Sequence, residues 1–478
     1  MTVLGAIFAA LLAVSVFRRS LFPWVFASSA AFPFSAAMQL GGNSLSPFHL
    51  AAALATTFLI ADTASSRRTP QQEGRAGRFA LGVFAVWASV VTLLAPLMFG
   101  GVRVLSARAG IDAAVDALDP LTYTVSTIAQ LAYALLSVGA VLYLGRTRIP
   151  ASLAFVPFGL GTVIAGVNYL CRMVGLPWPS ELFDTSVNVI YGIAHYRGGV
   201  FNEPSELAGF SVASFALFAV GAFCSRGRRR VVLASLAVLA VVNALNSQAG
   251  TALASLFVVA ALLSALAAWQ FVTRGNGTVA MIILAGLAAL AWIAWGDALT
   301  SWGASIFLNK LDSSSFSVRT ASDRISLHIV SQTWGLGVGL GANRPSSFAA
   351  MMLSCTGVIG AAAFAVFLFK ICATAMRSSL GLPAAWGLIA MLCAKTISLP
   401  DLTTPAMWVL IAACANSAWQ AHEPLRTARH TQFLHPGTGE SHGPQGRHSN
   451  STPTVGFDPA DHARRRRLRA GRHAAVQA

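Results

Sequence analysis

Two stretches of this 478-residue chain hold basic residues whose side chains could bind an anion. The first stretch contains Arg197, and the second contains Lys310, Arg319, Arg324 and Arg344. Arginine presents a planar fork of N–H donors that matches a phosphate or a carboxylate with two parallel hydrogen bonds. This grouping predicts a site for an anionic ligand such as a phosphate. The alternative is that these residues are ordinary polar residues of solvated loops.

The composition indicates what must position these arginines. Hydrophobic residues make up 55% of the chain and charged residues 10%, whereas a soluble globular protein carries roughly 25% charged residues. Six cysteines in a chain of this length exclude a secreted disulfide scaffold. The aliphatic content excludes disorder for most of the chain. We therefore expect a protein whose surroundings are mostly lipid.

Apolar runs along the chain predict membrane-spanning helices. A helix needs about 20 apolar residues to cross ~30 Å of hydrocarbon, and a backbone exposed to lipid must satisfy its own hydrogen bonds. The candidate spans are 3–17, 21–40, 48–62, 79–99, 121–144, 150–172, 207–224, 231–245, 250–272, 278–296, 349–370, 383–399 and 403–420. The sequence thus predicts an all-α, polytopic integral membrane protein with about 12–13 transmembrane helices.

The basic residues between these runs predict the orientation, because short cytoplasmic loops are enriched in Lys and Arg. The basic groups that can share one side are Arg18-Arg19, the loop 67–78, Arg146 with Arg148, the run 226–230, Arg274, and Lys370 with Arg377. If that side is cytoplasmic, two long loops, about 173–206 and 297–348, lie on the opposite side. The arginines of the first paragraph stand in these loops, against the usual charge bias, which favours an anionic ligand at the outer leaflet.

The two ends of the chain have separate interpretations. The run 3–17 is followed, not preceded, by basic residues, which favours a retained helix over a signal peptide. Residues 1–420 form the expected transmembrane domain, and residues 421–478 a disordered basic cytoplasmic tail rich in Gly, Pro, Ser, His and Arg. The tail's run 464–467 is a solvated topogenic segment or contacts anionic headgroups. No folded nucleic-acid-binding module accompanies it, so no nucleic acid is expected as a partner. The six cysteines have no metal-ligand spacing and are interpreted as packing residues.

The two expected extracytoplasmic loops contain three short motifs, and a fourth lies in the span that follows the second loop. Residues 195–206 read HYRGGVFNEPSE and run directly into a span. Residues 317–324 read SVRTASDR, residues 334–341 read WGLGVGLG, and residues 357–360 read GVIG. The glycine-rich run lacks the Lys-Ser/Thr of a nucleotide loop, so its glycines are expected to allow tight turns where the chain re-enters the membrane.

In order, spacing and placement, these motifs resemble the O-antigen polymerase/ligase superfamily of bacterial envelope glycan assembly, over about residues 190–370. The resemblance implies a GT-C-like, multi-pass glycosyltransferase of the bacterial inner membrane. Its donor would be an oligosaccharide linked to undecaprenyl diphosphate. In a polymerase the acceptor is another lipid-linked repeat unit, and in a ligase it is the lipid A core. The implied partners are this lipid-linked oligosaccharide, membrane lipid, a flippase and a chain-length regulator.

The resemblance also implies roles for individual residues. By position, Arg197 and one or both of Arg319 and Arg324 would grip the diphosphate, and Arg344 is a further candidate. Fixed guanidinium groups would stabilise the charge that develops on this leaving group. No metal-binding carboxylate cluster is visible in the sequence, so neither a metal nor another cofactor is expected.

The acceptor hydroxyl needs a base, and two residues are candidates. Glu203 follows Arg197 by six residues at the start of a span, where partial burial would raise the pKa of its carboxyl. His328 follows Arg324 by four residues and shares its face if that stretch is helical. Alternatively, Glu203 caps the helix whose first turn contains Pro204, and His328 is a packing residue.

Three functions from two classes remain open. Ligases of the superfamily carry a histidine just after the glycine-rich turn, whereas residues 342–347 here read ANRPSS. This difference favours a polymerase over a ligase. A transporter of the lipid-linked glycan would be expected to show internal repeats with paired broken helices, and none is visible in the sequence.

Overall fold

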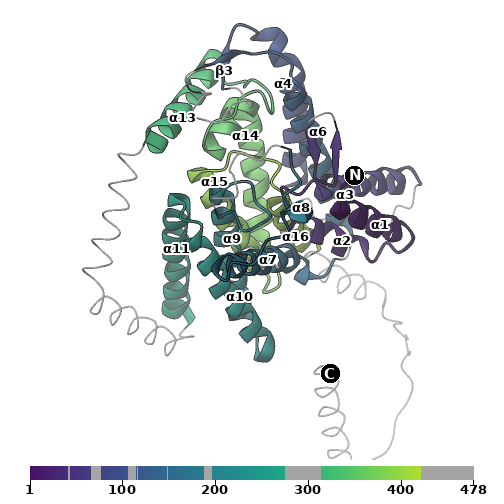
Figure 1. Ribbon diagram of the computed structural model, residues 1–478. Coiled ribbons are helices and arrows are strands. Elements are labelled where there is room, and N and C mark those ends of the chain that lie inside the picture. Colours follow the sequence, from purple (N-terminus) through teal and green to yellow (C-terminus); the bar gives the residue numbers. More distant parts are fainter. Residues whose placement is uncertain are drawn as a thin grey trace, which may run out of the picture. The chain divides into compact units, whose positions relative to one another are not determined.

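The computed structural model describes residues 1–40, 43–65, 77–105, 115, 117–147, 149–187, 196–274 and 314–420, and these are mostly helical (Figure 1). The helices are α1 (Val3–Phe17), α2 (Phe22–Ser29), α3 (Pro47–Ala64), α4 (Arg78–Met98), α6 (Val125–Arg146), the 3-10 helix η1 (Ala151–Ala154), α7 (Phe155–Met173), α8 (Ser180–Phe183), α9 (Pro204–Cys224), α10 (Gly227–Asn246), α11 (Gly250–Arg274), α13 (Ser314–Gln332), α14 (Phe348–Ala375), α15 (Leu382–Ile397) and α16 (Pro405–Gln420). Two small antiparallel hairpins pair β1 (Met38–Leu40) with β2 (Asn43–Leu45), and β3 (Arg103–Val104) with β4 (Asp119–Pro120).

Seven of the described helices are long and apolar enough to cross a membrane: α3, α4, α6, α7 with the end of η1, α9, α10 and α14. The chain is therefore a multi-pass, all-α membrane protein in the part that the structure describes. Helices α1 and α15, and residues 252–265 of α11, are apolar but shorter. The expected span 278–296, Lys310 and the tail from residue 421 lie outside the described residues.

The expected span 21–40 is wrong. Helix α2 ends at Ser29, and after a turn the chain forms strand β1 instead. The physical reason is Pro33, which lacks an N–H group and disfavours the helical conformation at the preceding residue. Other boundaries moved less: α9 starts at Pro204, three residues before the expected position, because proline is well suited to the first turn of a helix.

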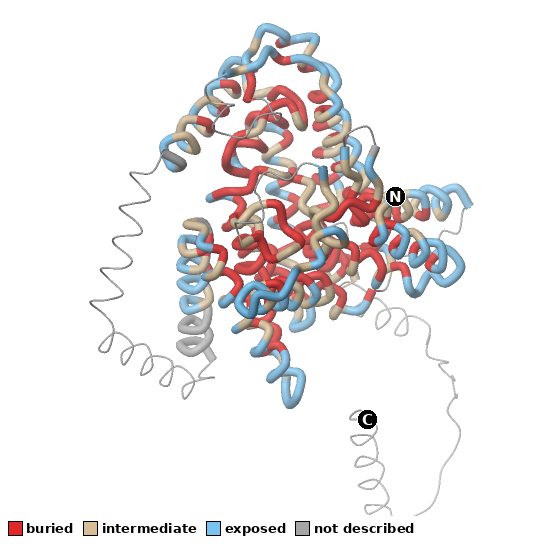
Figure 2. The backbone as a smooth tube through the Cα atoms, viewed as in Figure 1, coloured by how far each residue is buried: buried red, intermediate tan, exposed pale blue. Residues whose placement is uncertain are grey.

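Helices α9, α15 and α16 form the interior of the bundle. Of the most apolar 18-residue window of α9, 78% is buried, compared with 28% for α10, so α9 is enclosed by protein while α10 faces outward. Nearly all of α16 is buried as well, and Figure 2 shows buried residues concentrated in these helices and in α14. Gly387 of α15 allows close packing, because a Cβ there would lie 3.2 Å from both Leu217 of α9 and Leu410 of α16.

Several helix ends with basic residues share one end of the bundle. The Arg78 guanidinium at the start of α4 lies 4.2 Å from the ring centre of Trp419, in the last turn of α16. The same tryptophan packs against Gly145 at the end of α6. The Arg229 guanidinium lies 5.9 Å from the ring of Phe155, the first residue of α7. These basic ends therefore lie on one side of the bundle, and their cytoplasmic orientation stays a prediction from the charge bias.

Helix α14 is broken at Gly357, and the glycine-rich run packs its backbone into the break. Gly357 has φ +67°. The amides of Val338 and Gly339 donate to the carbonyls of Ser354 and Cys355 at 2.9 and 2.8 Å. A Cβ at Gly357 would lie 2.3 Å from the carbonyl oxygens of residues 335 and 336. Because the four glycines at 335, 337, 339 and 341 have φ of +75° to +95°, the predicted tight turns are confirmed.

Candidate functional site

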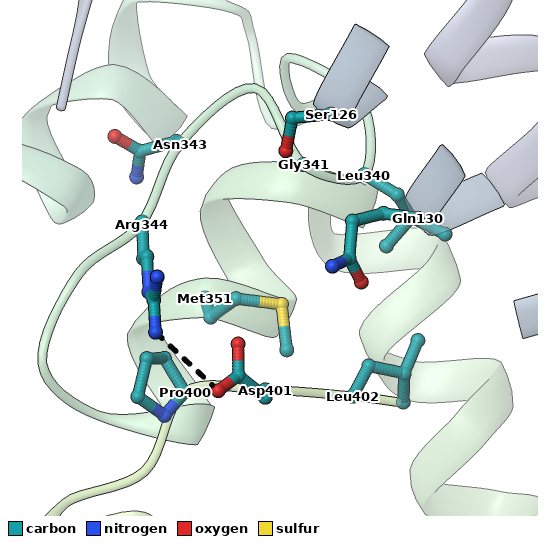
Figure 3. A pocket seen from close by; sticks show the side chains of 10 residues that line it. All are labelled: Ser126, Gln130, Leu340, Gly341, Asn343, Arg344, Met351, Pro400, Asp401 and Leu402. Atoms are coloured by element: carbon teal, nitrogen blue, oxygen red, sulfur yellow. Dashed lines mark ion pairs between the residues drawn. The ribbon is translucent and has the colours of Figure 1, made fainter. Parts of the chain in front are cut away.

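A polar pocket lies at the end of the bundle opposite the basic helix ends. It encloses about 490 Å³ of space not filled by atoms, part of it open to solvent. Four segments meet there: the start of α6, the end of the glycine-rich run, the start of α14 and the link between α15 and α16 (Figure 3). The lining residues are Ser126, Gln130, Leu340, Gly341, Asn343, Arg344, Met351, Pro400, Asp401 and Leu402. Helix α16 starts beside this pocket and ends at the basic end, about 24 Å away for a helix of 16 residues.

Arg344 and Asp401 face one another across the pocket. Nη2 of Arg344 lies 3.5 Å from Oδ2 of Asp401, and their side chains are 33% and 31% exposed (Figure 3). The carboxylate of Asp401 is the largest influence raising the pKa of the Arg344 guanidinium; burial opposes it, and Glu203 and Glu206 add to it. This pair is longer than an ordinary charge-assisted hydrogen bond, and both side chains are about one third exposed.

Asn343, next to Arg344, anchors the pocket wall. Its amide nitrogen donates to the hydroxyls of Ser326 on α13 and Ser354 on α14, both at 2.9 Å. Its amide oxygen accepts from the backbone N–H of Leu105 at 3.0 Å. One buried side chain thus ties three segments together. Because every polar atom of this amide group has a partner, Asn343 holds the backbone of Arg344 in a fixed place.

Asp323 fixes the other end of the same loop. Its Oδ1 accepts from the backbone N–H groups of Ser346 and Ser347, and from the Ser346 hydroxyl, each at 3.1 Å. These residues precede the first turn of α14, and Ser347 caps that helix by accepting from the Ala350 N–H. Helix α13 is thereby attached to the loop that carries Arg344. Arg319, four residues earlier on α13, donates to the Ser398 hydroxyl at 2.8 Å.

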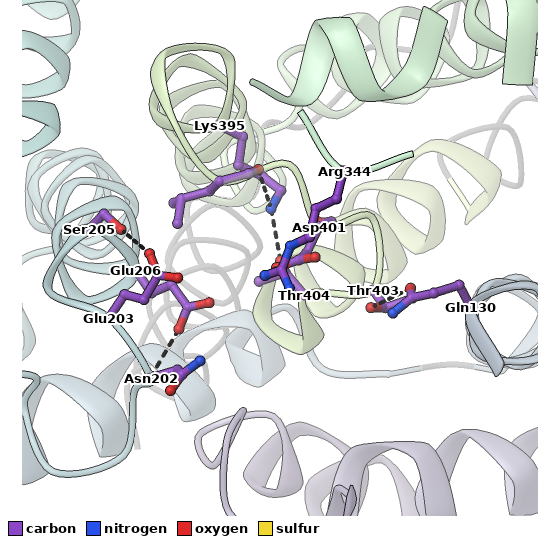
Figure 4. Close-up of polar contacts among 11 residues, drawn as sticks. Gln130, Asn202, Glu203, Ser205, Glu206, Arg344, Lys395, Asp401, Thr403 and Thr404 are labelled. Carbon is purple, nitrogen blue, oxygen red and sulfur yellow. Dashed lines mark hydrogen bonds and ion pairs between the residues drawn. The ribbon is translucent and has the colours of Figure 1, made fainter. Parts of the chain in front are cut away.

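Two carboxylates at the start of α9 lie near this pocket (Figure 4). Glu203 occupies the N-cap position, but its side chain makes no capping bond to the helix; it accepts from the Ser205 hydroxyl at 2.9 Å. Glu206 accepts from the Asn202 N–H at 3.0 Å. Both act electrostatically on Arg344. Glu203 therefore stands at the N-cap position, as its alternative interpretation predicts, but its carboxylate makes no capping hydrogen bond.

Arg197 has a different environment from the one expected. Its Nη2 lies 2.5 Å from Oδ2 of Asp184, and its Nη1 donates to the Phe201 carbonyl at 3.3 Å. The Arg197 side chain is 8% exposed, and it is not among the residues that line the pocket. Asp184 follows α8, which is tied to the N-terminal segment by a 2.6 Å bond from the Ser35 hydroxyl to the Phe183 carbonyl. A diphosphate could reach Arg197 only by displacing Asp184 from this buried pair.

Arg324 and His328 both lie on the exposed side of α13. Their shared exposure agrees with the expected helical spacing. His328 Nε2 contacts the Gln332 side chain at 3.2 Å. Neither residue lines the pocket. Of the six predicted site residues, the structure thus brings Arg344, Arg319 and Glu203 to the α15–α16 link and its surroundings, and places the other three elsewhere.

Sequence reasoning missed four polar residues of this region. Asp401 and Gln130 line the pocket, Glu206 lies beside it, and Lys395 is buried behind it (Figure 4). A signal was present for one of them. An ionisable residue within an apolar helix is unusual and tends to be functional, which should have drawn attention to Lys395 in the expected span 383–399.

The chain matches no known family model, and a search of curated proteins finds no match either. Among the described residues, no group of three or more His, Cys, Asp or Glu side chains is placed to hold a metal ion. The interpretation of the pocket therefore depends on its own geometry and on the motifs quoted above.

Proposed function

We propose that the protein is a membrane glycosyltransferase that polymerises an oligosaccharide linked to undecaprenyl diphosphate, at the outer leaflet of the bacterial inner membrane. The observation that carries this proposal is the loosely held Arg344–Asp401 pair in an open pocket, with Glu203 nearby. The pocket's place supports it as well. It lies across the bundle from the basic helix ends, which the positive-inside rule assigns to the cytoplasm.

Arg344 would hold the diphosphate of the donor. In the reaction, the bond between the sugar's anomeric carbon and the diphosphate oxygen breaks, and the diphosphate leaves with the electron pair. A guanidinium fixed beside that oxygen stabilises the growing negative charge. Arg319, whose Nη1 donates to the Ser398 hydroxyl just before the α15–α16 link, would assist from α13.

A carboxylate would take the proton from the acceptor hydroxyl. As the hydroxyl oxygen of the acceptor sugar bonds to the anomeric carbon, its proton passes to the base, and undecaprenyl diphosphate is released. Glu203 fits this role better than His328, because it lies near Arg344 while His328 is on the exposed side of α13. General bases of this kind contribute about 10²–10⁴-fold to rates.

The experiment is deletion of the gene in its own host, with plasmid-borne variants and a gel of the surface polysaccharide. Deletion should leave single repeat units in place of long chains, and the Arg344→Ala variant should reproduce that pattern. Arg377→Ala is the matched control, because Arg377 is an exposed arginine just after α14, far from the pocket; it should restore full chain lengths.

The same gel distinguishes the alternatives. A ligase would leave long chains stranded on the carrier lipid, and a transporter would leave repeat units on the cytoplasmic side, inaccessible to added glycosidase in intact spheroplasts. Normal chain lengths with Arg344→Ala would contradict the assignment of the pocket, and normal chain lengths after deletion would contradict the polymerase function.

A further inference from the structure

Lys395 is a wholly buried lysine in the last turn of apolar helix α15, with an exposed fraction of 0%. A buried charge inside a membrane protein is costly unless it is fully paired. An ammonium group has three donors and no acceptor. Its surroundings must therefore supply partners in three directions, and those partners indicate what the residue does.

Two hydrogen bonds and an aromatic ring surround the ammonium group in the described part of the chain. Nζ donates to the Thr404 hydroxyl at 2.8 Å and to the Leu399 carbonyl at 3.3 Å. It also lies 5.5 Å from the centre of the Phe348 ring, within range of a cation–π contact. Lys395 is fully buried and is not among the residues that line the pocket, so it is not placed as a second cation beside Arg344. Its charge acts electrostatically on Asp401 and Glu206.

The two hydrogen-bonding partners stand on either side of Asp401 in the sequence, and Figure 4 shows Lys395, Asp401 and Thr404 close together. Leu399 precedes Asp401 by two residues and has φ +88°, a left-handed conformation that is unfavourable for a branched side chain. Thr404 follows by three residues, and its hydroxyl also donates to the Asp401 carbonyl at 3.1 Å. The ammonium group thus joins the two ends of the turn 399–404 through its hydrogen bonds to Leu399 and Thr404. Strain of this kind persists only where the surrounding structure holds it.

We infer that Lys395 is a positioning residue, which holds the strained turn 399–404 so that the carboxylate of Asp401 stays opposite Arg344. This inference rests on the proposed function for its activity readout, but the geometry that it describes is independent of the reaction. Asp401 and the ligand's anion would compete for the same guanidinium group of Arg344. When a diphosphate takes over Arg344, the turn keeps the displaced carboxylate beside the reacting groups.

The test is a double-mutant cycle between Lys395→Met and Asp401→Asn. Methionine keeps the length and apolar bulk of the lysine stem but removes both hydrogen bonds. A displacement of about 1 Å at a reacting group can cost about a hundredfold in rate, so Lys395→Met should lower polymerisation by that order. If Lys395 acts through Asp401, the double variant should be no slower than Asp401→Asn alone, because coupled residues are not additive.

A second readout does not need the reaction. Inorganic pyrophosphate is titrated against the purified protein in detergent, and its Kd is measured for the four members of the cycle. Asp401→Asn should tighten binding, since a competing carboxylate is removed. The effect of Lys395→Met on Kd should differ between the natural background and the Asp401→Asn background. The direct effect of the lost positive charge on pyrophosphate is common to both backgrounds and cancels in that comparison. The electrostatic interaction between Lys395 and Asp401 does not cancel, and the Thr404 variants below, which keep the Lys395 charge, separate it from the effect of the turn.

A smaller change guards against a folding defect in Lys395→Met. Thr404→Val removes one bond to Nζ at nearly constant shape, whereas Thr404→Ser keeps the hydroxyl. Thr404→Val should slow polymerisation and lower the melting temperature, because a buried donor loses its partner, whereas Thr404→Ser should keep both near the natural values. Rates are compared at a temperature where both variants are folded. If Lys395→Met does not fold, this pair and its coupling to Asp401→Asn carry the test.

Each outcome decides something. Coupling in both readouts supports the inference, and additive effects in both contradict it while leaving the proposed function standing. If the natural protein makes no polymer but binds pyrophosphate, the proposed function fails, and the pyrophosphate cycle alone decides the role of Lys395. If the natural protein neither makes polymer nor binds pyrophosphate, both proposals fall.

Discussion

Two arginine–aspartate pairs among the described residues, Arg197–Asp184 and Arg344–Asp401, lie at the same end of the bundle and differ in length and exposure. Arg197 and Asp184 are 2.5 Å apart, with side chains 8% and 19% exposed. Arg344 and Asp401 are 3.5 Å apart, with side chains 33% and 31% exposed in a pocket. The first arginine also has a backbone carbonyl as a partner. The same two residue types therefore make a sealed structural contact in one place and an open, exchangeable one in the other.

The difference shows why an arginine in an extracytoplasmic loop is not by itself a ligand site. A buried pair is desolvated and must keep its partner, because separating it leaves an uncompensated charge. A solvent-exposed pair contributes only about 0–1 kcal/mol, and a partly exposed pair lies closer to that limit than a buried one. Availability to a ligand thus depends on exposure and pair length, and the two pairs can be separated by experiment.

The largest effect on stability should come from Arg197→Ala. It leaves Asp184 buried without its partner, and breaking such a pair costs about 3 kcal/mol or more. We expect a clearly lower melting temperature and lower yield of protein in detergent. The paired replacement of Arg197 and Asp184 by leucine should recover part of the loss, since no charge is then left unpaired. An unchanged melting temperature in Arg197→Ala would show that the pair is not structural.

Arg344→Ala should have the opposite profile. Its stability cost should be smaller than that of Arg197→Ala because the pair is long and about one third exposed, while polymerisation should be lost. Arg344→Lys keeps the charge but not the planar fork, so it should restore only part of the chain length. Melting temperature and the polysaccharide gel are measured on the same variants. A drop in stability as large as that of Arg197→Ala would contradict the contrast between the pairs.

The spans of this fold were largely predictable, because hydropathy acts locally. The run 3–17 is helix α1 to the residue, and the ends of α14 and α15 differ from the expected ones by a few residues. Where the prediction failed, at 21–40, a proline outweighed hydropathy. Helix α10 starts four residues early, at Gly227, because arginines are good helix formers and extend a helix beyond its apolar part.

The pocket was only half predictable, because its two sides come from distant parts of the sequence. Arg344 stands beside a motif that drew attention to it. Its partner Asp401 is 57 residues further on, and is returned to the pocket by the α14–α15 pair of helices. Nothing in the local sequence of Arg197 shows that Asp184 will bury it. Pairing of charges is a tertiary property, so residue type and loop position led to the same predicted role for Arg197 and Arg344.

Salt should separate the two pairs by a smaller amount. Charges exposed to solvent are screened within about 8 Å at physiological ionic strength, and buried ones much less. Raising NaCl from about 0.05 M to about 0.5 M should therefore weaken pyrophosphate binding at the Arg344 pocket. The melting-temperature difference between natural protein and Arg197→Ala should change little over the same range. If the same salt range reduced the melting-temperature difference as strongly as it weakened pyrophosphate binding, the Arg197–Asp184 pair would be as exposed to solvent as the Arg344–Asp401 pair.

The smallest effects should come from Arg324→Ala and His328→Ala, because neither residue belongs to either ion pair. Each side chain lies on the exposed side of α13, away from the pocket lining. Exposed substitutions of this kind usually change stability by no more than about 0.5 kcal/mol. Both variants should also give near-normal chain lengths on the gel, with Asp323→Ala as the contrast on the same helix, since it removes three hydrogen bonds to the Arg344 loop. If His328→Ala abolishes polymerisation at normal stability, then α13 turns its exposed side to the substrate, and the base is His328 and not Glu203.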